Sequence, residues 1–369
     1  MGDNGKSIKD CFSGVTDPRD SNKRHQLIDI IAVALCAVIC SADTWEEIEE
    51  FGHVKHLWFK TFLGLPHGIP SSDTFARVFA SLDPAEFREA FLKWGEAIKT
   101  AVKGCIAIDG KTVRHSYSNE TSPIHMVSAW ALENRMVLGQ VKTNEKSNEI
   151  TAIPELLQVL ALEGCIVTID AMGCQKTIAE KIADKGADYV LGLKKNQGNL
   201  HADVELFFQD CLASGFGDVP YNCCQTIDGD HGRVETRRYW ATSDIEWLSD
   251  KPLWKNLRTI VMVERERNVN GEVSVETGYY ISSLGSEIKQ LAKAIRGHWG
   301  IENSLHWVLD IAFREDESRI RKDHAPENFA VLRHMALNLL KREPSVKSIK
   351  RKRLRAGWDN EYLVKILYA

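Results

Sequence analysis

The sequence predicts an α/β protein, with a mixed sheet flanked by helices, a helical domain before the sheet and a β-rich insertion within it. Two near-identical phrases, Cys105–Gly110 (CIAIDG) and Cys165–Ala171 (CIVTIDA), are short continuous apolar runs. Such runs are typical of strands buried on both faces. Residues 17–103 repeat apolar positions at helical spacing, and residues 222–283 read as mainly extended.

The N-terminal part predicts a loose leader over residues 1–16 and then several short helices over residues 17–103. Short helices with tight connections suit a helix-turn-helix-like DNA-binding module, although most helical domains do not bind DNA. The apolar stretch 27–42 follows three basic residues but contains Asp29 and is short for a membrane span. We therefore expect a buried helix, and neither secretion nor membrane insertion.

The central part predicts a sheet of mixed direction. A hairpin pair is followed by strand, helix and strand, with a parallel crossover, which is the layout of an RNase H-like layer. We expect this core to comprise residues 104–220 and 286–342, interrupted by a β-rich insertion over 221–285 in which Asn270-Gly271 is a hairpin turn. Predicted strands lie near 104–108, 124–132, 136–143, 165–169 and 188–193, and predicted helices near 150–162, 174–185 and 199–213.

Charge is unevenly distributed along the chain. The formal net charge is −4, yet residues 341–355 carry eight Lys and Arg against one Glu. This basic segment, within a C-terminal region 343–369, suits an arm that follows DNA phosphates, or else a solvated helix. The nine cysteines show no CxxC pair and several sit in apolar runs, which favours thiols in a reducing cytoplasm.

Asp109 and Asp170 each end one of the two similar apolar phrases. If the two strands lie side by side, the carboxylates meet at one point, as a divalent metal site requires. The alternative is that each aspartate only caps a strand end or a helix.

A third acidic ligand is suggested by the stretch Arg296–Asp310, in which His298, Glu302 and His306 would share one side of a helix. Glu302 would then border the apolar stripe that packs on the sheet. The alternatives are an ordinary helix Glu with two core histidines, or a ligand supplied by Asp310, Glu315 or Asp316.

Several blocks together resemble the H-repeat-associated DDE transposases of bacterial insertion sequences. They follow one another in the order of that family and span nearly the whole chain: Ile106–Lys111, His125–Trp130, Lys146–Pro154, Ile169–Gln175, Lys194–Gln197 and His298–Asn303. The resemblance implies an RNase H-like catalytic core with a β insertion and a metal-binding triad of Asp109, Asp170 and Glu302. Carboxylate ligands suit Mg²⁺, for which Mn²⁺ can substitute. Because two ends must meet in one complex, we also expect a homodimer on double-stranded DNA, namely the terminal repeats of the element and the target.

One departure from the better-studied relatives concerns the helix that carries the catalytic Glu. They have Tyr, Arg and Lys where this chain has Ile295, His298 and Leu309. His298 can donate a hydrogen bond to a phosphate without a permanent charge. The three differences concern the handling of the DNA end rather than metal binding.

The resulting functional hypothesis is DNA transposition by metal-dependent cleavage of element ends and transfer of the freed 3′-OH into target DNA. Further DNA contacts are expected from Lys194 and Lys195, from His298, from the helices 27–100, and from Lys350, Arg351 and Arg353 in the basic segment. Two alternatives remain: a decayed or domesticated DNA-binding protein without catalysis, and a metal-dependent nuclease that does not join strands.

Overall fold

The computed structural model describes residues 8–20, 23–98, 102–117, 122–143, 149–217, 219–230 and 233–368. The chain divides into two compact units. The first consists of residues 1–101, 110–146 and 302–369, and the second of residues 102–109 and 147–301. Some of the divisions between the units fall inside the predicted catalytic core, among them Asp109/Gly110 and Ile301/Glu302. Lys146–Asn148, which belong to one of the family-like blocks, lie outside the described residues.

The first unit begins with a cluster of helices, as predicted for residues 17–103. Thr44 shows why one of them starts where it does: its side chain accepts from the Glu47 N–H while the Glu47 side chain reaches back to the cap, a reciprocal capping box. The helices are α1 (Ile8–Phe12), α2 (Leu27–Ile39), α3 (Trp45–Val54), α4 (His56–Phe59), α5 (Ser72–Ser81) and α6 (Pro84–Ile98).

Residues 8–12, which we predicted to be part of a loose leader, form helix α1. Cys11 and Phe12 are buried there, and the Phe12 ring packs edge-on against Phe87 of α6, with 5.4 Å between centroids. A five-residue helix is too short to be stable alone, so this contact is what orders it.

The rest of the first unit combines a hairpin with C-terminal helices. Strands β2 (His125–Ala131) and β3 (Met136–Lys142) pair antiparallel, and α12 (Ala325–Arg342) packs against β3, α2, α5 and α6. The buried Asn338 of α12 bonds both the N–H (2.8 Å) and the C=O (2.9 Å) of Val137. The remaining elements are the π-helical turn η3 (Glu302–His306), α11 (Trp307–Phe313), η4 (Glu315–Glu317), α13 (Ile349–Trp358) and α14 (Asn360–Leu367).

The second unit is built on a sheet with the strand order β1-β4-β5-β9-β8-β7-β6. Strand β1 (Gly104–Thr112) pairs parallel with β4 (Cys165–Ile169), and β4 pairs parallel with β5 (Asp188–Leu193). The parallel connection from β4 to β5 passes through α8 (Lys176–Asp184), as predicted. The other helical elements of this part are α7 (Glu149–Val159), η1 (Lys195–Gln197), α9 (Gly198–Ser214) and α10 (Ile288–His298).

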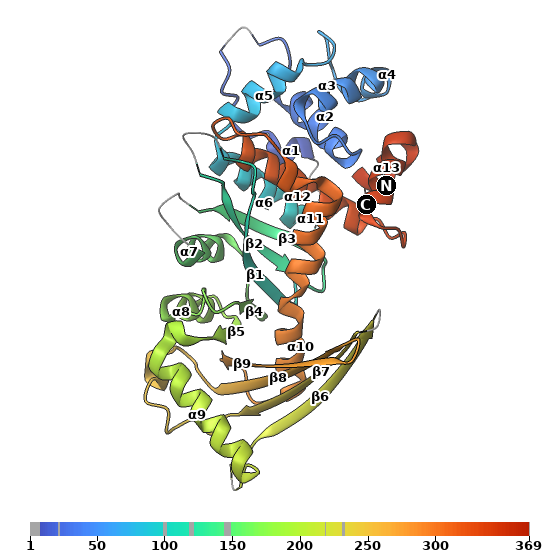
Figure 1. Cartoon of the computed structure of the whole chain (residues 1–369). Helices are drawn as coiled ribbons and strands as arrows, with labels where there is room; N and C mark the ends of the chain where they lie inside the picture. Colours follow the sequence, from blue (N-terminus) through green and yellow to red (C-terminus); the bar gives the residue numbers. More distant parts are fainter. Residues whose placement is uncertain are drawn as a thin grey trace. The chain divides into compact units, whose positions relative to one another are not determined.

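The predicted β-rich insertion is four strands that continue this sheet. β9 pairs antiparallel with β5, so the insertion shares hydrogen bonds with the core. The Asn270-Gly271 turn is present, and both residues have positive φ, 52° and 94°, as a two-residue hairpin loop requires. The strands are β6 (Asn222–Asp230), β7 (Arg233–Thr242), β8 (Thr259–Val269) and β9 (Glu272–Ser282), with the short turn η2 (Lys251–Leu253) between β7 and β8, and they form the curved yellow-to-orange ribbon of Figure 1.

The strand order identifies the fold class. It begins β3-β2-β1-β4-β5, where β2 and β3 belong to the first unit, β4 and β5 to the second, and β1 is divided between them. An antiparallel hairpin followed by parallel strand-helix-strand is the RNase H-like arrangement, so the predicted fold class is confirmed. Within the described residues, no helix combines the length and the apolar character that a bilayer crossing needs.

Candidate active site

The two candidate aspartates lie at matching positions of neighbouring parallel strands: Asp109 within β1 (Gly104–Thr112) and Asp170 directly after β4 (Cys165–Ile169). The β1–β4 register pairs Gly104 with Cys165 and runs to Ile108 with Ile169. Asp109 and Asp170 each follow the last pair of this register. The prediction that the two similar phrases lie side by side as buried strands is therefore confirmed, with both carboxylates at the same edge of the sheet.

The Asp170 side chain is held by its own loop. Its Oδ1 accepts hydrogen bonds from the N–H groups of Met172 (3.0 Å) and Gly173 (3.3 Å). Such bonds to the following backbone orient an aspartate without neutralising its charge. Both amides use Oδ1, so among these two contacts Oδ2 is left for a cation.

A glycine on β5 allows close packing behind this loop. A Cβ at Gly192 would lie 3.1 Å from the Ala171 nitrogen and 3.4 Å from the carbonyl carbon of Asp170. Any side chain at position 192 would push on the backbone that carries the candidate ligand. The sequence analysis did not identify Gly192, because the need for a glycine arises only from the packing of two strands.

The predicted phosphate contacts Lys194 and Lys195 follow β5 and are exposed. The turn that carries them is fixed to the Asp170 loop by two side-chain amides. Asn196 Nδ2 donates to the Ala171 carbonyl at 2.7 Å, and Gln197 Nε2 donates to the Cys174 carbonyl at 2.9 Å. The two lysines thus belong to a segment bonded to that loop, at the same sheet edge.

His298 lies at the end of α10 and contacts β4 beside the candidate site. Its Nδ1 is 3.1 Å from the Oγ1 of Thr168, a buried residue two positions before Asp170. Burial lowers the pKa of His298, although the negative charge of Asp170 acts in the opposite direction. The imidazole is accordingly neutral near pH 7 and can offer a phosphate one N–H without a charge.

Glu302 opens the π-helical turn η3 in the first unit, and its side chain is exposed. The prediction that His298, Glu302 and His306 share one helical side assumed a uniform α-helix. The π turn changes that spacing, and single π turns are frequent at functional sites. His306 is buried, and burial, followed by the charge of Lys111, lowers its pKa to about 4.

The three carboxylates that compete with Glu302 as ligands surround Lys111, all within the first unit. The Lys111 Nζ lies 2.7 Å from Asp310 Oδ1, 3.2 Å from Glu315 Oε2 and 3.0 Å from Asp316 Oδ1. Burial alone would lower the pKa of Lys111, but these carboxylates, Glu315 first, raise it. Asp310, Glu315 and Asp316 are therefore engaged in an ion-pair cluster, which favours Glu302 as the third ligand. Lys111 had no role in the sequence analysis.

Two of the predicted tail contacts are available to DNA and one is not. Lys350 and Arg351 are exposed on α13. Arg353 is 1% exposed: its guanidinium donates to the Val38 carbonyl and to Asp43 Oδ1 (2.8 and 2.9 Å) and lies over the Phe313 ring. Arg353 joins α13 to the N-terminal helices, so it is not among the DNA contacts that we propose.

Two of the three candidate ligands, Asp109 and Asp170, suit a hard divalent cation. Across the described residues, no group of three or more His, Cys, Asp or Glu side chains is arranged to hold a metal ion. Mg²⁺ is usually bound by one or two carboxylates together with waters and substrate phosphates rather than by an all-protein cage. Asp109 and Asp170, each directly after the last residue pair of the β1–β4 register, suit this kind of site.

Comparison with known proteins gives consistent matches along the chain. Residues 100–339 match the family described as Transposase DDE domain, and residues 9–95 match the family described as DDE_Tnp_1-associated. The "Putative transposase YncI" of Escherichia coli O157:H7 is 43% identical over 98% of this chain and 94% of its own length. The "H repeat-associated putative transposase YhhI" of Escherichia coli K12 is 39% identical over 98% of both.

Among solved structures, a piggyBac transposase synaptic complex with hairpin DNA aligns with 98% of this chain and 78% of its own. The TM-score is 0.43 and the identity 11%, too low to add to the fold assignment. The family match over residues 100–339 and the two full-length relatives establish that the chain belongs to the DDE transposases, within the H repeat-associated group.

Proposed function

We propose that this transposase cuts DNA at the ends of its element and joins the freed 3′-OH to target DNA, using Asp109, Asp170 and Glu302. The observation that carries the proposal is that Asp109 and Asp170 each directly follow the last residue pair of the parallel β1–β4 register. Two aspartates at matching positions of neighbouring strands, in a chain of the DDE family, suit phosphoryl transfer better than a structural role.

The three carboxylates would hold divalent cations, Mg²⁺ or Mn²⁺. Bound there, such a cation neutralises charge at the scissile phosphate and lowers the pKa of a water. The amides of Met172 and Gly173 keep Asp170 in one orientation. Because the ligand does not have to reorient during the reaction, this preorganisation stabilises charge as it develops.

The chemistry consists of two in-line displacements at phosphorus. In the first, a water oxygen attacks the phosphodiester at the element end, the 3′ oxygen leaves and takes up a proton, and the products are a 3′-OH and a 5′-phosphate. In the second, that 3′ oxygen attacks a target phosphodiester and displaces the target's own 3′ oxygen. One P–O bond forms and one breaks in each step, so joining requires no external energy source.

The positive groups around the aspartates would position the DNA. Lys194 and Lys195 are exposed on the segment bonded to the Asp170 loop and suit phosphate contacts. His298 would add an uncharged N–H donor. The helices within residues 27–100 would bind the terminal repeats, and Lys350 and Arg351 would follow the DNA backbone.

Two element ends must meet before strand transfer, which favours a homodimer on DNA. We place the protein in the cytoplasm, where its DNA substrate is found.

The test is a cleavage and joining assay with labelled element-end DNA in Mg²⁺ or Mn²⁺. The native chain should cut at the element boundary and join the 3′-OH end to a target plasmid. Asp109→Asn, Asp170→Asn and Glu302→Gln should each lose both steps while still binding the DNA. Asp210→Asn and Glu361→Gln change exposed carboxylates elsewhere in the two units and should behave like the native chain. Cutting without joining would make the protein a nuclease, and binding without cutting would make it a DNA-binding protein only.

A further inference from the structure

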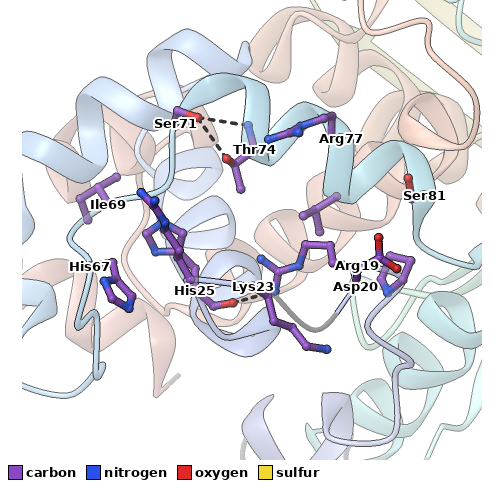
Figure 2. Close-up of a pocket in the computed structure, with 13 residues that line it drawn as sticks. Arg19, Asp20, Lys23, His25, His67, Ile69, Ser71, Thr74, Arg77 and Ser81 are labelled. Atoms are coloured by element: carbon purple, nitrogen blue, oxygen red, sulfur yellow. Dashed lines mark hydrogen bonds between the residues drawn. The ribbon is translucent and has the colours of Figure 1, made fainter.

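A pocket with a volume of about 740 Å³ opens among the N-terminal helices of the first unit. Three segments line it: the chain that leads into α2, the loop before α5, and one side of α5 itself. Figure 2 shows residues from all three segments around the opening. The lining residues are Pro18, Arg19, Asp20, Lys23, Arg24, His25, His67, Ile69, Ser71, Thr74, Arg77, Val78 and Ser81.

Positive charge dominates this pocket. Arg19, Lys23, Arg24 and Arg77 contribute four cationic side chains, whereas Asp20 is the one acidic residue among the described lining. Asp17, just outside, pairs with Arg19 at 2.9 Å and with Lys23 at 3.2 Å. Even after both aspartates are counted, an excess of positive charge remains, so the pocket attracts anions.

Arg19 is already fixed in place. Its Nε and Nη2 donate to the two oxygens of Asp17, each at 2.9 Å, and Nη2 also donates to the His25 carbonyl at 2.7 Å. None of these bonds uses Nη1. An arginine held in this way can donate to a phosphate without losing further side-chain freedom.

The first turns of α5 add donors to the same wall. Ser71 caps the helix by accepting from the Thr74 N–H, and Ser71, Thr74 and Arg77 follow one another along the side that lines the pocket (Figure 2). The Arg77 Nε bonds its own helix at the Asp73 carbonyl, which leaves the two terminal nitrogens for a ligand. A helix start with hydroxyl groups and an arginine is a favourable environment for phosphate.

The positive charges near the pocket also affect the pKa of His25. Burial, followed by the charges of His67 and Arg19, lowers the pKa of His25, and its ring lies 6.4 Å from that of His67. The His25 Nδ1 is a buried atom to which the described part of the chain supplies no hydrogen-bond partner. The ring is therefore uncharged near neutral pH.

We propose that this pocket binds phosphate groups of the DNA backbone and fixes the position of the DNA on the N-terminal helices. The inference deepens the proposed function, on which it rests. Guanidinium, ammonium and hydroxyl donors around a helix start suit phosphate oxygens, and contacts of this kind position a duplex without reading its sequence. The volume exceeds that of a single phosphate, so it accommodates a stretch of backbone rather than an isolated ion.

The test measures how the affinity for a short duplex of arbitrary sequence depends on salt. The association constant K falls as salt rises, so the slope of log K against log salt concentration is negative. In the pocket variant Arg24→Gln with Arg77→Gln this slope should become less steep by about 0.9 for each phosphate that the pocket no longer neutralises. The weakening should be the same for any duplex sequence. Arg24→Lys with Arg77→Lys, which keeps the charges, should recover most of the native slope.

The matched control is Arg135→Gln with Lys322→Gln, which removes two exposed charges of the same unit outside the pocket and outside the N-terminal helices and should leave the slope within about 0.5 of native. The proposal is overturned if the pocket variant has the same slope as this control, or if the native chain does not bind the duplex. Because the probe carries no element end, a chain that binds it normally but never cuts element DNA would contradict the proposed function and not this inference.

Discussion

At the scale of single residues, the Lys111 cluster shows how the chain neutralises acidic residues that would otherwise compete for a cation. Asp310, Glu315 and Asp316 converge on one ammonium group, and Glu315 also lies 3.6 Å from the buried Arg333. Replacing one partner of a buried charge cluster leaves the others unpaired, and this costs more than the cluster itself contributes.

We therefore expect Lys111→Met to destabilise the protein by about 3 kcal/mol, measured by urea unfolding. Lys347→Met, which removes an exposed lysine, serves as the control and should change stability by less than about 0.5 kcal/mol. A loss below about 1 kcal/mol for Lys111→Met would mean that the three carboxylates do not depend on this lysine.

Glu343 provides a prediction about pH. Burial would raise its pKa, but bonds from Ser345, Tyr362, Lys352 and Lys365 lower it from 4.5 to about 2. A carboxyl whose pKa is depressed in the folded state contributes stability above its unfolded pKa and loses it as pH falls through the folded value. This contribution is on the order of 3 kcal/mol.

The gap in unfolding free energy between the native chain and Glu343→Gln should be largest near neutral pH. It should shrink as the pH falls from 4.5 towards 2, the two pKa values of this carboxyl. Urea unfolding across that pH range measures the gap. A gap that stays constant with pH would show that Glu343 titrates normally in the folded protein.

At the scale of elements, the packing of β5 on the end of β4 makes Gly192 a critical position. Gly192→Ala would place a methyl carbon 3.1 Å from the backbone nitrogen of Ala171. No side-chain rotation can relieve this contact, because a Cβ and a backbone nitrogen are both fixed by the backbone. We expect a loss of about 1–3 kcal/mol of stability and a larger loss of DNA cleavage than of DNA binding.

Gly198→Ala is the matched control for that change, because a Cβ there meets nothing within 4 Å and position 198 starts helix α9. Cleavage by the control should equal that of the native chain. Equal cleavage by Gly192→Ala would show that the Asp170 loop tolerates displacement.

The elements differ in how well the sequence predicts them, and the reasons are physical. The buried strands β1 and β4 were predictable because a short continuous apolar run that ends at an aspartate is typical of a buried strand. Helix α1 was not, because its order depends on the contact between Phe12 and Phe87, far apart in the chain. The π turn at Glu302 changes the spacing on which the predicted helical face relied.

The basic segment shows that charge patterning has a similar limit as a predictor of exposed residues. Lys350, Arg351 and Arg353 are all basic residues of this one segment. In the structure, α13 exposes the first two and buries the third against α2. Charge patterning alone does not reveal which side of a helix packs on the protein, since this depends on partners elsewhere in the chain. Gly192 and Lys111 could not be found from sequence for the same reason.

At the scale of the whole molecule, the proposed active site takes two ligands from the second unit, Asp109 in β1 and Asp170 after β4, and a third, Glu302, from the first unit. The prediction of a DDE core is confirmed by the family match over residues 100–339, and residues 9–95 match a family described as DDE_Tnp_1-associated. DNA binding by the N-terminal helices stays a prediction. The roles of the individual acidic residues and the strand-transfer step remain proposals that one experiment can decide.

That experiment is cleavage of labelled element-end DNA in Mg²⁺ or Mn²⁺ by the native chain, Asp170→Asn and Glu302→Gln, with DNA binding measured in parallel. The account predicts cutting at the element boundary by the native chain alone and near-equal binding by all three. Cutting by Asp170→Asn or Glu302→Gln at the native rate, or no cutting by the native chain in either metal, would contradict it.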